Sequence, residues 1–137
     1  MKKLVLVCSF IASFIYAVEF EKREDMVYDK TTHLFWESTP TIKKMNWSDA
    51  VEYCELKKLR LPHIYELKSL VEYQKYQPAI RTNLIKVRTD DYYWSSSKGV
   101  DIPSDIWLVH FKNGFDYWRN EKLNSHVLCV SFKKDNK

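Results

Sequence analysis

The sequence predicts a single α+β domain in which two helices accompany several short strands. Apolar residues recur every three or four positions across residues 46–56 and again across residues 64–71, which is the spacing of helices that bury one side. Short β-prone runs lie before and after this pair, and the dipeptide Asn113-Gly114 between two of them is a strong hairpin signal. Strands and helices segregated along a chain are typical of the α+β class.

The first expected elements are two short strands between Met26 and Trp36, joined by the turn residues 29–32. Asp and Thr favour such a turn because their side chains can hydrogen-bond the local backbone. Residues 37–45 are mostly polar and contain a proline, so we expect a loop that leads into the first helix.

The first helix is expected to begin after Asn46. Asparagine is a good N-cap residue, and Asp49 adds a carboxylate near the positive end of the helix dipole. The apolar face of this helix is formed by Trp47, Ala50, Val51 and Cys54.

A rigid turn, Arg60-Leu61-Pro62, is expected to link the two helices, because proline fixes the backbone for a turn or a first helical position. We expect Arg60 to be partly buried, with its guanidinium group held by a carboxylate or by backbone carbonyls. The second helix presents Ile64, Leu67, Leu70 and Val71 on one side. It is expected to fade through residues 72–77 and stop before Pro78, since the residue preceding a proline disfavours the α conformation.

The C-terminal half predicts a series of strands. They are expected at residues 92–97, 106–111 and 115–118, with a loop over 98–105 and a hairpin turn at 112–114. The last strand is expected at residues 126–132. Because it is apolar on both faces, it is expected in the middle of a sheet.

Residues 1–17 have the features of a secretory signal peptide. Lys2 and Lys3 precede an apolar run that is too short to span a bilayer comfortably and that ends at Ala17, where we expect cleavage. Residues 18–137 would then form one domain in the periplasm or outside the cell, with no stable membrane span. An uncleaved anchor is the alternative, but no stop-transfer pattern follows.

The mature chain is only weakly basic. Cleavage removes two of the 22 basic residues, and 18 acidic residues remain, so the net charge falls from +4 to +2. This is too weak a field to predict a nucleic-acid partner.

Two cysteines, Cys54 and Cys129, remain after cleavage, in a compartment that permits disulfides. We expect them to pair, which would stabilise the fold by about 4 kcal/mol on the chain-entropy model. Two separate buried thiols are the alternative.

Motifs spread over residues 27–132 have an ordered spacing. They are Tyr28-Asp29, Thr32, Leu34, Trp36, Trp47, Ala50, Cys54, Arg60-Leu61-Pro62, Glu66-Leu67, Leu70, Pro78, Tyr93-Trp94-Ser95-Ser96, Phe111, Gly114, Val127 and Cys129-Val130. Together they resemble the Lcl C-terminal domain family of collagen-like adhesins, which is related in fold to C-type lectins.

The resemblance implies a C-type-lectin-like fold in which two helices pack on a small, mainly antiparallel sheet. It also implies a disulfide between the first helix and the last strand, where Cys54 and Cys129 stand. In this family the turn usually has Trp before the arginine and Thr after the proline. Here Leu59 and His63 take those places, which weakens the capping of the second helix.

No catalytic residue, metal ion or cofactor is expected. His63 and Glu66 could offer two metal ligands, but the four histidines are scattered, and packing or surface roles are commoner. Loop acids between residues 90 and 105 could face calcium, yet six or more oxygens would have to converge, so solvated acids are expected. The run 95–97 lacks a nucleophile-elbow pattern and an assignable His/Asp partner.

The aromatic residues instead indicate a binding surface. By analogy of fold, we expect it on the loop at residues 95–105 and the hairpin at residues 112–118. The candidate residues are Trp94, Ser96, Trp107, Tyr117, Trp118 and Arg119.

The leading functional hypothesis is a non-catalytic exported module of the bacterial cell envelope that docks to another envelope protein in a larger assembly. The alternative is an adhesin-like module that binds a glycan or a sulfated polysaccharide. A basic groove of Lys57, Lys58, Lys112 and Arg119 would favour this alternative.

Overall fold

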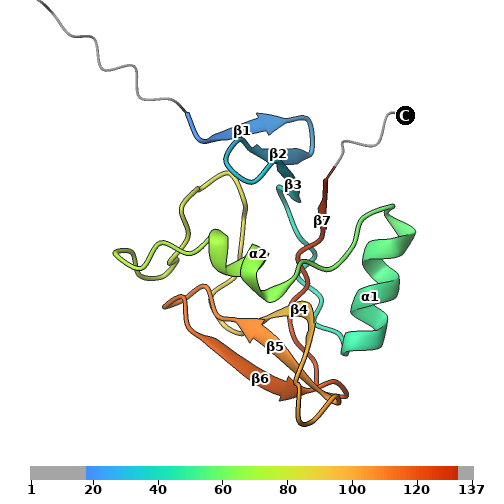
Figure 1. Cartoon of the computed structure of the whole chain (residues 1–137). Coiled ribbons are helices and arrows are strands. Elements are labelled where there is room, and N and C mark those ends of the chain that lie inside the picture. Colours follow the sequence, from blue (N-terminus) through green and yellow to red (C-terminus); the bar gives the residue numbers. More distant parts are fainter. Residues whose placement is uncertain (1–17, 133–137) are drawn as a thin grey trace, which may run out of the picture.

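The computed structural model describes residues 18–132, so the predicted signal peptide lies outside the described residues. The elements are β1 (Phe20–Arg23), β2 (Met26–Asp29), β3 (Leu34–Glu37), α1 (Trp47–Leu56), α2 (Ile64–Ser69), β4 (Tyr93–Lys98), β5 (Asp105–Val109), β6 (Asp116–Asn120) and β7 (Val130–Ser131). The predicted α+β class is therefore confirmed. Figure 1 shows the two helices beside the strands of the C-terminal half.

Four strands form the first sheet, in the antiparallel order β1-β2-β3-β7. The predicted hairpin between Met26 and Trp36 is confirmed as β2 and β3. Its turn is held by Asp29, whose carboxylate accepts the N–H of Thr31 at 2.9 Å and the hydroxyl of Thr32 at 2.7 Å. β1 was not predicted, because three of its four residues are charged and resemble a loop.

The other three strands form a second antiparallel sheet in the order β4-β5-β6. The two sheets replace the one small sheet that the resemblance implied. The predicted hairpin turn between β5 and β6 is confirmed, and Gly114 within it has a φ of +81°, which favours glycine. An added Cβ there would also collide with the side chain of Val71, so the turn packs closely on the end of α2.

The predicted last strand, 126–132, is corrected to the two residues of β7. Residues 126–130 are fully buried, as their apolar pattern predicted, but their backbone changes partners along the way. His126 pairs with Tyr93 of the second sheet, whereas Val130 pairs with Trp36 of the first sheet. This run therefore connects the two sheets.

The helix predictions are half right. α1 is capped by Asn46, whose side chain accepts the N–H of Asp49 at 2.9 Å, as expected. α2 has only six residues and does not continue through residues 72–77. The helix does not continue because Val71 forms an antiparallel β-bridge with Ile80. The backbone there hydrogen-bonds to a later segment of the chain.

The second sheet separates two hydrophobic clusters. Tyr93 and Val109 belong to the cluster that includes the buried side of α2. Trp94 and Leu108, their neighbours in sequence, belong to the cluster that includes the buried side of α1. Side chains alternate between the faces of a strand, so β4 and β5 are buried on both faces.

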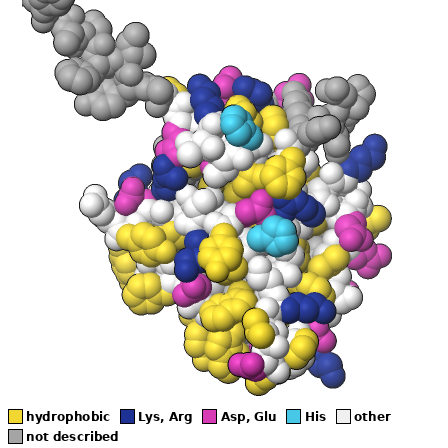
Figure 2. Space-filling view, in the orientation of Figure 1, with side chains coloured by type: hydrophobic (Ala, Val, Ile, Leu, Met, Phe, Trp, Pro, Cys, Tyr) yellow, Lys and Arg dark blue, Asp and Glu magenta, His cyan; other side chains and the backbone are white. Residues whose placement is uncertain are grey.

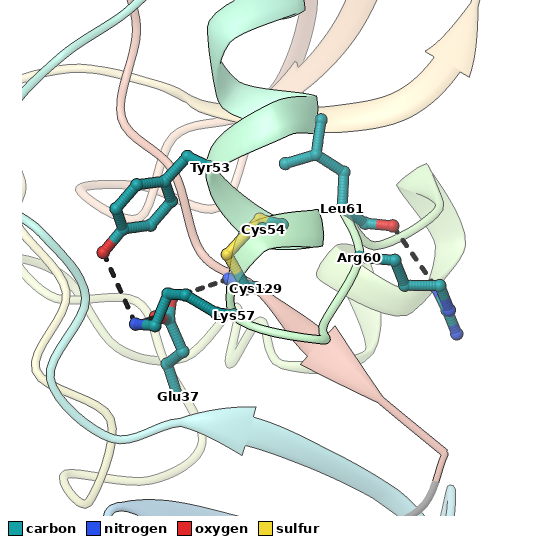
Figure 3. The surroundings of a disulfide bond; sticks show 7 residues. All are labelled: Glu37, Tyr53, Cys54, Lys57, Arg60, Leu61 and Cys129. Atoms are coloured by element: carbon teal, nitrogen blue, oxygen red, sulfur yellow. Dashed lines mark hydrogen bonds and ion pairs between the residues drawn. A yellow bond between two sulfur atoms is a disulfide. The ribbon is translucent and has the colours of Figure 1, made fainter. Parts of the chain in front are cut away.

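The predicted disulfide between Cys54 and Cys129 is confirmed, with an S–S distance of 2.07 Å. It ties α1 to the run that connects the two sheets. Figure 3 shows Tyr53 of α1 and the C-cap residue Lys57 beside the disulfide, with Glu37 close to Lys57. The buried Glu37 carboxylate accepts the N–H of Cys129 at 2.9 Å and pairs with the Lys57 ammonium group.

Candidate functional site

The turn between the helices has the structural role predicted for it. The Arg60 guanidinium group binds both carboxylate oxygens of Glu66, at 2.8 and 2.9 Å, and also donates to the carbonyl of Leu61 at 3.3 Å. Burial alone would raise the pKa of Glu66, but hydrogen bonds from Arg60 and from the N–H of His63 outweigh it and hold this pKa below its usual range.

The serine run of β4 completes this turn from outside. The hydroxyl of Ser97 accepts the N–H of Ile64 at 3.0 Å, and the N–H of Ser96 donates to the carbonyl of Pro62 at 2.8 Å. The first turn of α2 is therefore capped by a strand more than thirty residues away, which supplements the capping expected to be weak at His63.

Trp94, a predicted member of the binding surface, is a core residue instead. Its ring is buried in the cluster beneath α1, and its indole N–H donates to the carbonyl of Met45 at 2.8 Å. Trp94 is buried because β4 lies between the two hydrophobic clusters, one of which includes residues of α1 and the other residues of α2. It offers no exposed ring to a partner.

Ser96 and Trp107 also have local roles. The hydroxyl of Ser96 contacts Nδ1 of His63 at 3.0 Å. Trp107 is partly buried and packs against the cluster that contains α2. Trp107 on β5 lies opposite Trp118 on β6, so the two side chains are neighbours on the same face of the sheet.

Tyr117 and Trp118, on β6, are the predicted residues that the structure leaves exposed. Their side chains are 52% and 47% accessible, and their rings stack at a centroid separation of 5.4 Å with an interplanar angle of 7°. β6 is one of the two outer strands of its sheet. The pair therefore forms a flat aromatic surface at the edge of the molecule.

Arg119, the third predicted residue of β6, is held in place by its neighbours. It pairs with Asp91 at 3.1 Å, donates to the Ser125 hydroxyl at 2.7 Å, and lies 5.3 Å from the centre of the Tyr92 ring. The Arg119 guanidinium group is therefore already engaged by groups of the same domain.

A larger exposed aromatic surface extends from β6 to α2, and we call it the aromatic face. It consists of Tyr65, Tyr73, Tyr76, Phe115, Tyr117 and Trp118. Figure 2 shows hydrophobic side chains gathered over α2 and the β5–β6 hairpin, with charged side chains among them.

Local contacts connect the two halves of this aromatic face. Lys68 of α2 pairs with Asp116 of β6 at 2.9 Å, and this hydrogen bond raises the pKa of Lys68. Tyr73 lies against Gly114 of the hairpin, and the Lys112 ammonium group is 5.9 Å from the centre of the Tyr76 ring.

The sequence did not single out the α2 half of the aromatic face. Tyr65 does not share the apolar face of α2 formed by Ile64 and Leu67. This position in the sequence could have indicated that its side chain points away from the core. Tyr73 and Tyr76 lie in the segment that was expected to continue the helix.

The proposed basic groove is not assembled. Lys57 and Lys58 lie at the end of α1, whereas Lys112 lies in the hairpin turn on the opposite side of the view in Figure 1. Lys57 pairs with the buried Glu37, and Arg119 pairs with Asp91.

The histidine contacts do not resemble a catalytic set. Ser96 meets His63 at Nδ1, and no carboxylate is found on Nε2 of His63 within the described residues. Nε2 of His126 contacts Asp90 at 2.9 Å, but the His126 ring is buried and out of reach of a substrate. Nucleophilic catalysis needs a hydroxyl, a base and an orienting group in sequence.

Residues 18–132 contain neither a cluster of metal-binding side chains nor a membrane-spanning helix. No three His, Cys, Asp or Glu side chains come together in a way that could hold a metal ion. No helix in this part of the chain is long and apolar enough to cross a membrane.

Comparison with known proteins supports the resemblance seen in the sequence. The family model of the Lcl C-terminal domain matches residues 25–131. Neither a curated protein nor a solved structure matches the chain. The C-type-lectin-like topology therefore stays a prediction.

Proposed function

Because the chain belongs to the Lcl C-terminal domain family, we propose that it is an exported, non-catalytic binding module that docks to another protein of the bacterial cell envelope. The family suggests an adhesin-like module, and the disulfide fits a domain that works outside the cytoplasm. The docking surface that we propose is the aromatic face.

The observation that carries this proposal is the aromatic face itself. Tyr65, Tyr73 and Phe115 are 81%, 63% and 64% accessible, although the domain buries other large aromatic residues completely. Exposed clusters of aromatic side chains mark interaction sites, because their burial by a partner removes much apolar surface from water. The Lys68–Asp116 pair in their midst would contribute a polar contact that fixes orientation.

A non-catalytic role is supported by the arrangement of the polar side chains. Arg60, Glu66 and Ser97 are committed to holding α2 in place. The contacts of the exposed His63 lack the second partner that would orient it as a base.

The test is capture of envelope partners from the periplasm with a tagged chain, chemical crosslinking and stringent washing. A double variant of the aromatic face, Tyr65→Ser with Tyr73→Ser, should lose the captured protein. The matched control is Ile42→Ser with Leu56→Ser, which removes two equally exposed apolar side chains elsewhere. If both double variants capture the same proteins as the unmodified chain, docking through the aromatic face is refuted.

The second candidate function is glycan binding, which the stacked Tyr117–Trp118 pair favours. Flat aromatic surfaces stack on the apolar faces of sugar rings. Because the basic groove is not assembled, such binding should depend on the rings and only weakly on salt. A glycan array probed at low salt tests it, and an array without hits removes this candidate.

A further inference from the structure

β6, an outer strand of the second sheet, has an open edge. It pairs with β5 on one side and, within the described residues, with no strand on the other. An unpaired edge is a template for another strand, and proteins commonly protect it with lysine, proline or a bulge. β6 reads Asp-Tyr-Trp-Arg-Asn, and its register with β5 is regular from Asp105 to Val109, so it has none of these protections.

The register shows which backbone groups face outward. The N–H of His110 donates to the carbonyl of Phe115, and the N–H of Glu121 donates to the carbonyl of Ser104. Hydrogen-bonded pairs alternate along antiparallel strands, so the backbone groups of Tyr117 and Arg119 face β5. The N–H and C=O groups of the alternate residues of β6 therefore point away from β5. These outward-facing residues are Asp116, Trp118 and Asn120, and the C=O of Asn120 already accepts the N–H of Leu123 at 3.1 Å.

The charges along this edge are already balanced within the domain. Asp116 pairs with Lys68, and Arg119 pairs with Asp91. Charges that protect an edge do so by repelling a second strand. An edge whose charges are paired presents little repulsion.

We propose that β6 pairs with β6 of a second copy of this chain, antiparallel and centred on Trp118. In this register the outward backbone groups of Trp118 meet their own counterparts, and the C=O of Asp116 accepts the N–H of Asn120 of the second copy. The side chain of Tyr117 lies opposite Arg119 of the second copy, where a guanidinium group and an aromatic ring attract each other. No like charges face each other.

The two-fold symmetry makes this edge a self-complementary, isologous interface. The three-stranded sheet of each copy becomes half of a six-stranded sheet. Tyr65 lies on α2 and Tyr73 lies in the segment that follows it, so neither is on β6, and their part of the aromatic face stays open. The dimer uses the edge that carries Trp118, whereas docking to an envelope protein can still use Tyr65 and Tyr73.

The first test is the molar mass of the exported chain, measured by sedimentation over a range of concentrations. The chain should dimerise, and Trp118→Pro should weaken dimerisation by about tenfold or more, because each copy loses one outward N–H. Tyr65→Ser should leave the dimerisation constant unchanged. A chain that stays monomeric at the highest concentrations, or a dimer that Trp118→Pro does not weaken, overturns the proposal.

A second test does not depend on how well the proline variant folds. Residues at the two-fold axis of an antiparallel pair lie about 5.5 Å apart at Cα, within the range of a disulfide. Trp118→Cys should therefore form a covalent dimer under mild oxidation, whereas Phe115→Cys on the same hairpin should not. Equal crosslinking of both variants, or of neither, contradicts the register.

Discussion

At the residue scale, the Glu66 side chain holds the turn between the helices against the start of α2. Its carboxylate binds the Arg60 guanidinium group through both oxygens and also accepts the N–H of His63 at 2.7 Å. The turn and the N-cap residue of α2 are thereby fixed to one side chain. A partly buried, bidentate pair of this kind is stronger than an exposed ion pair.

This arrangement predicts an acid-dependent contribution to stability. The folded state lowers the pKa of Glu66 below the ordinary value of 4.5, so the stabilisation is present above that pH and is lost as the pH falls through the folded pKa. Glu66→Gln should therefore lower the free energy of unfolding by about 1–2 kcal/mol at pH 7 and reduce its loss on acidification. Chemical denaturation across pH measures both effects.

The control for this prediction is Glu52→Gln, which changes an exposed carboxylate of α1. It should leave both the stability at pH 7 and the acid dependence nearly unchanged. If Glu66→Gln behaves like Glu52→Gln, the carboxylate does not hold the turn.

Residue type predicted the role of Arg60 but not the burial of individual tryptophans. An arginine between two leucines and before a proline implied a partly buried guanidinium group, and the ion pair with Glu66 bears this out. Trp94 and Trp118 are both strand residues, yet the first is buried and the second is 47% accessible. Both strands are at an end of the sheet, but β4 is covered by the two hydrophobic clusters and by the bridge from Tyr93 to His126, whereas β6 is exposed; this is tertiary information.

At the scale of the elements, α1 ends in a strained residue. Lys58 has a φ of +57°, a left-handed conformation that usually belongs to glycine at this position. The N–H of Leu59 returns to the carbonyl of Cys54 at 2.9 Å, as it does in a helix ending of the Schellman type. The chain keeps the geometry of a glycine ending without the glycine.

Lys58→Gly should therefore raise the free energy of unfolding by about 0.5–1 kcal/mol, because it relieves the strain of a side chain at positive φ. Lys58→Ala is the control, since it removes the charge and keeps the strain, and it should give no gain. Thermal melting of the two variants measures the difference. Equal stability of Lys58→Gly and Lys58→Ala would show that the left-handed conformation is not costly here.

Element boundaries were predictable where the signals are local. The cap at Asn46 and the turn at Gly114 are formed as expected, because both depend on a few neighbouring residues. The ends of α2 and β7 were not predictable. Both are set by backbone pairing with distant segments, Val71 with Ile80 and Val130 with Trp36.

At the scale of the whole molecule, the disulfide and the buried run 126–130 hold the two sheets and α1 together. The disulfide closes a loop with a sequence separation of 75 residues. The same run pairs with β4 at one end and with β3 at the other. Loss of the disulfide should therefore lower the stability of the whole domain.

The double variant Cys54→Ser with Cys129→Ser should lower the free energy of unfolding by about 4 kcal/mol, because the unfolded chain regains the freedom that the closed loop removes. Reduction of the unmodified chain under denaturing conditions, followed by refolding in reductant, should give a similar loss. Denaturant titration of the oxidised and reduced chains measures it. A loss below about 1 kcal/mol would mean that the packed core holds the run without the disulfide.

The aromatic face also belongs to this scale, since two elements far apart in sequence build it. Aromatic content, together with analogy of fold, predicted a binding surface on the β5–β6 hairpin, and part of the candidate set is found exposed there. The contribution of α2 could not be foreseen, because it requires that Lys68 and Asp116 meet.

Site-specific photocrosslinking in the periplasm tests docking through the aromatic face most directly. A photoreactive amino acid in place of Tyr73 should give one discrete protein adduct, and the same group in place of Leu56 on α1 should not. The adduct from position 73 should disappear when Phe115→Ser is added. Identical adducts from positions 73 and 56, or no protein adduct from position 73, would contradict the account.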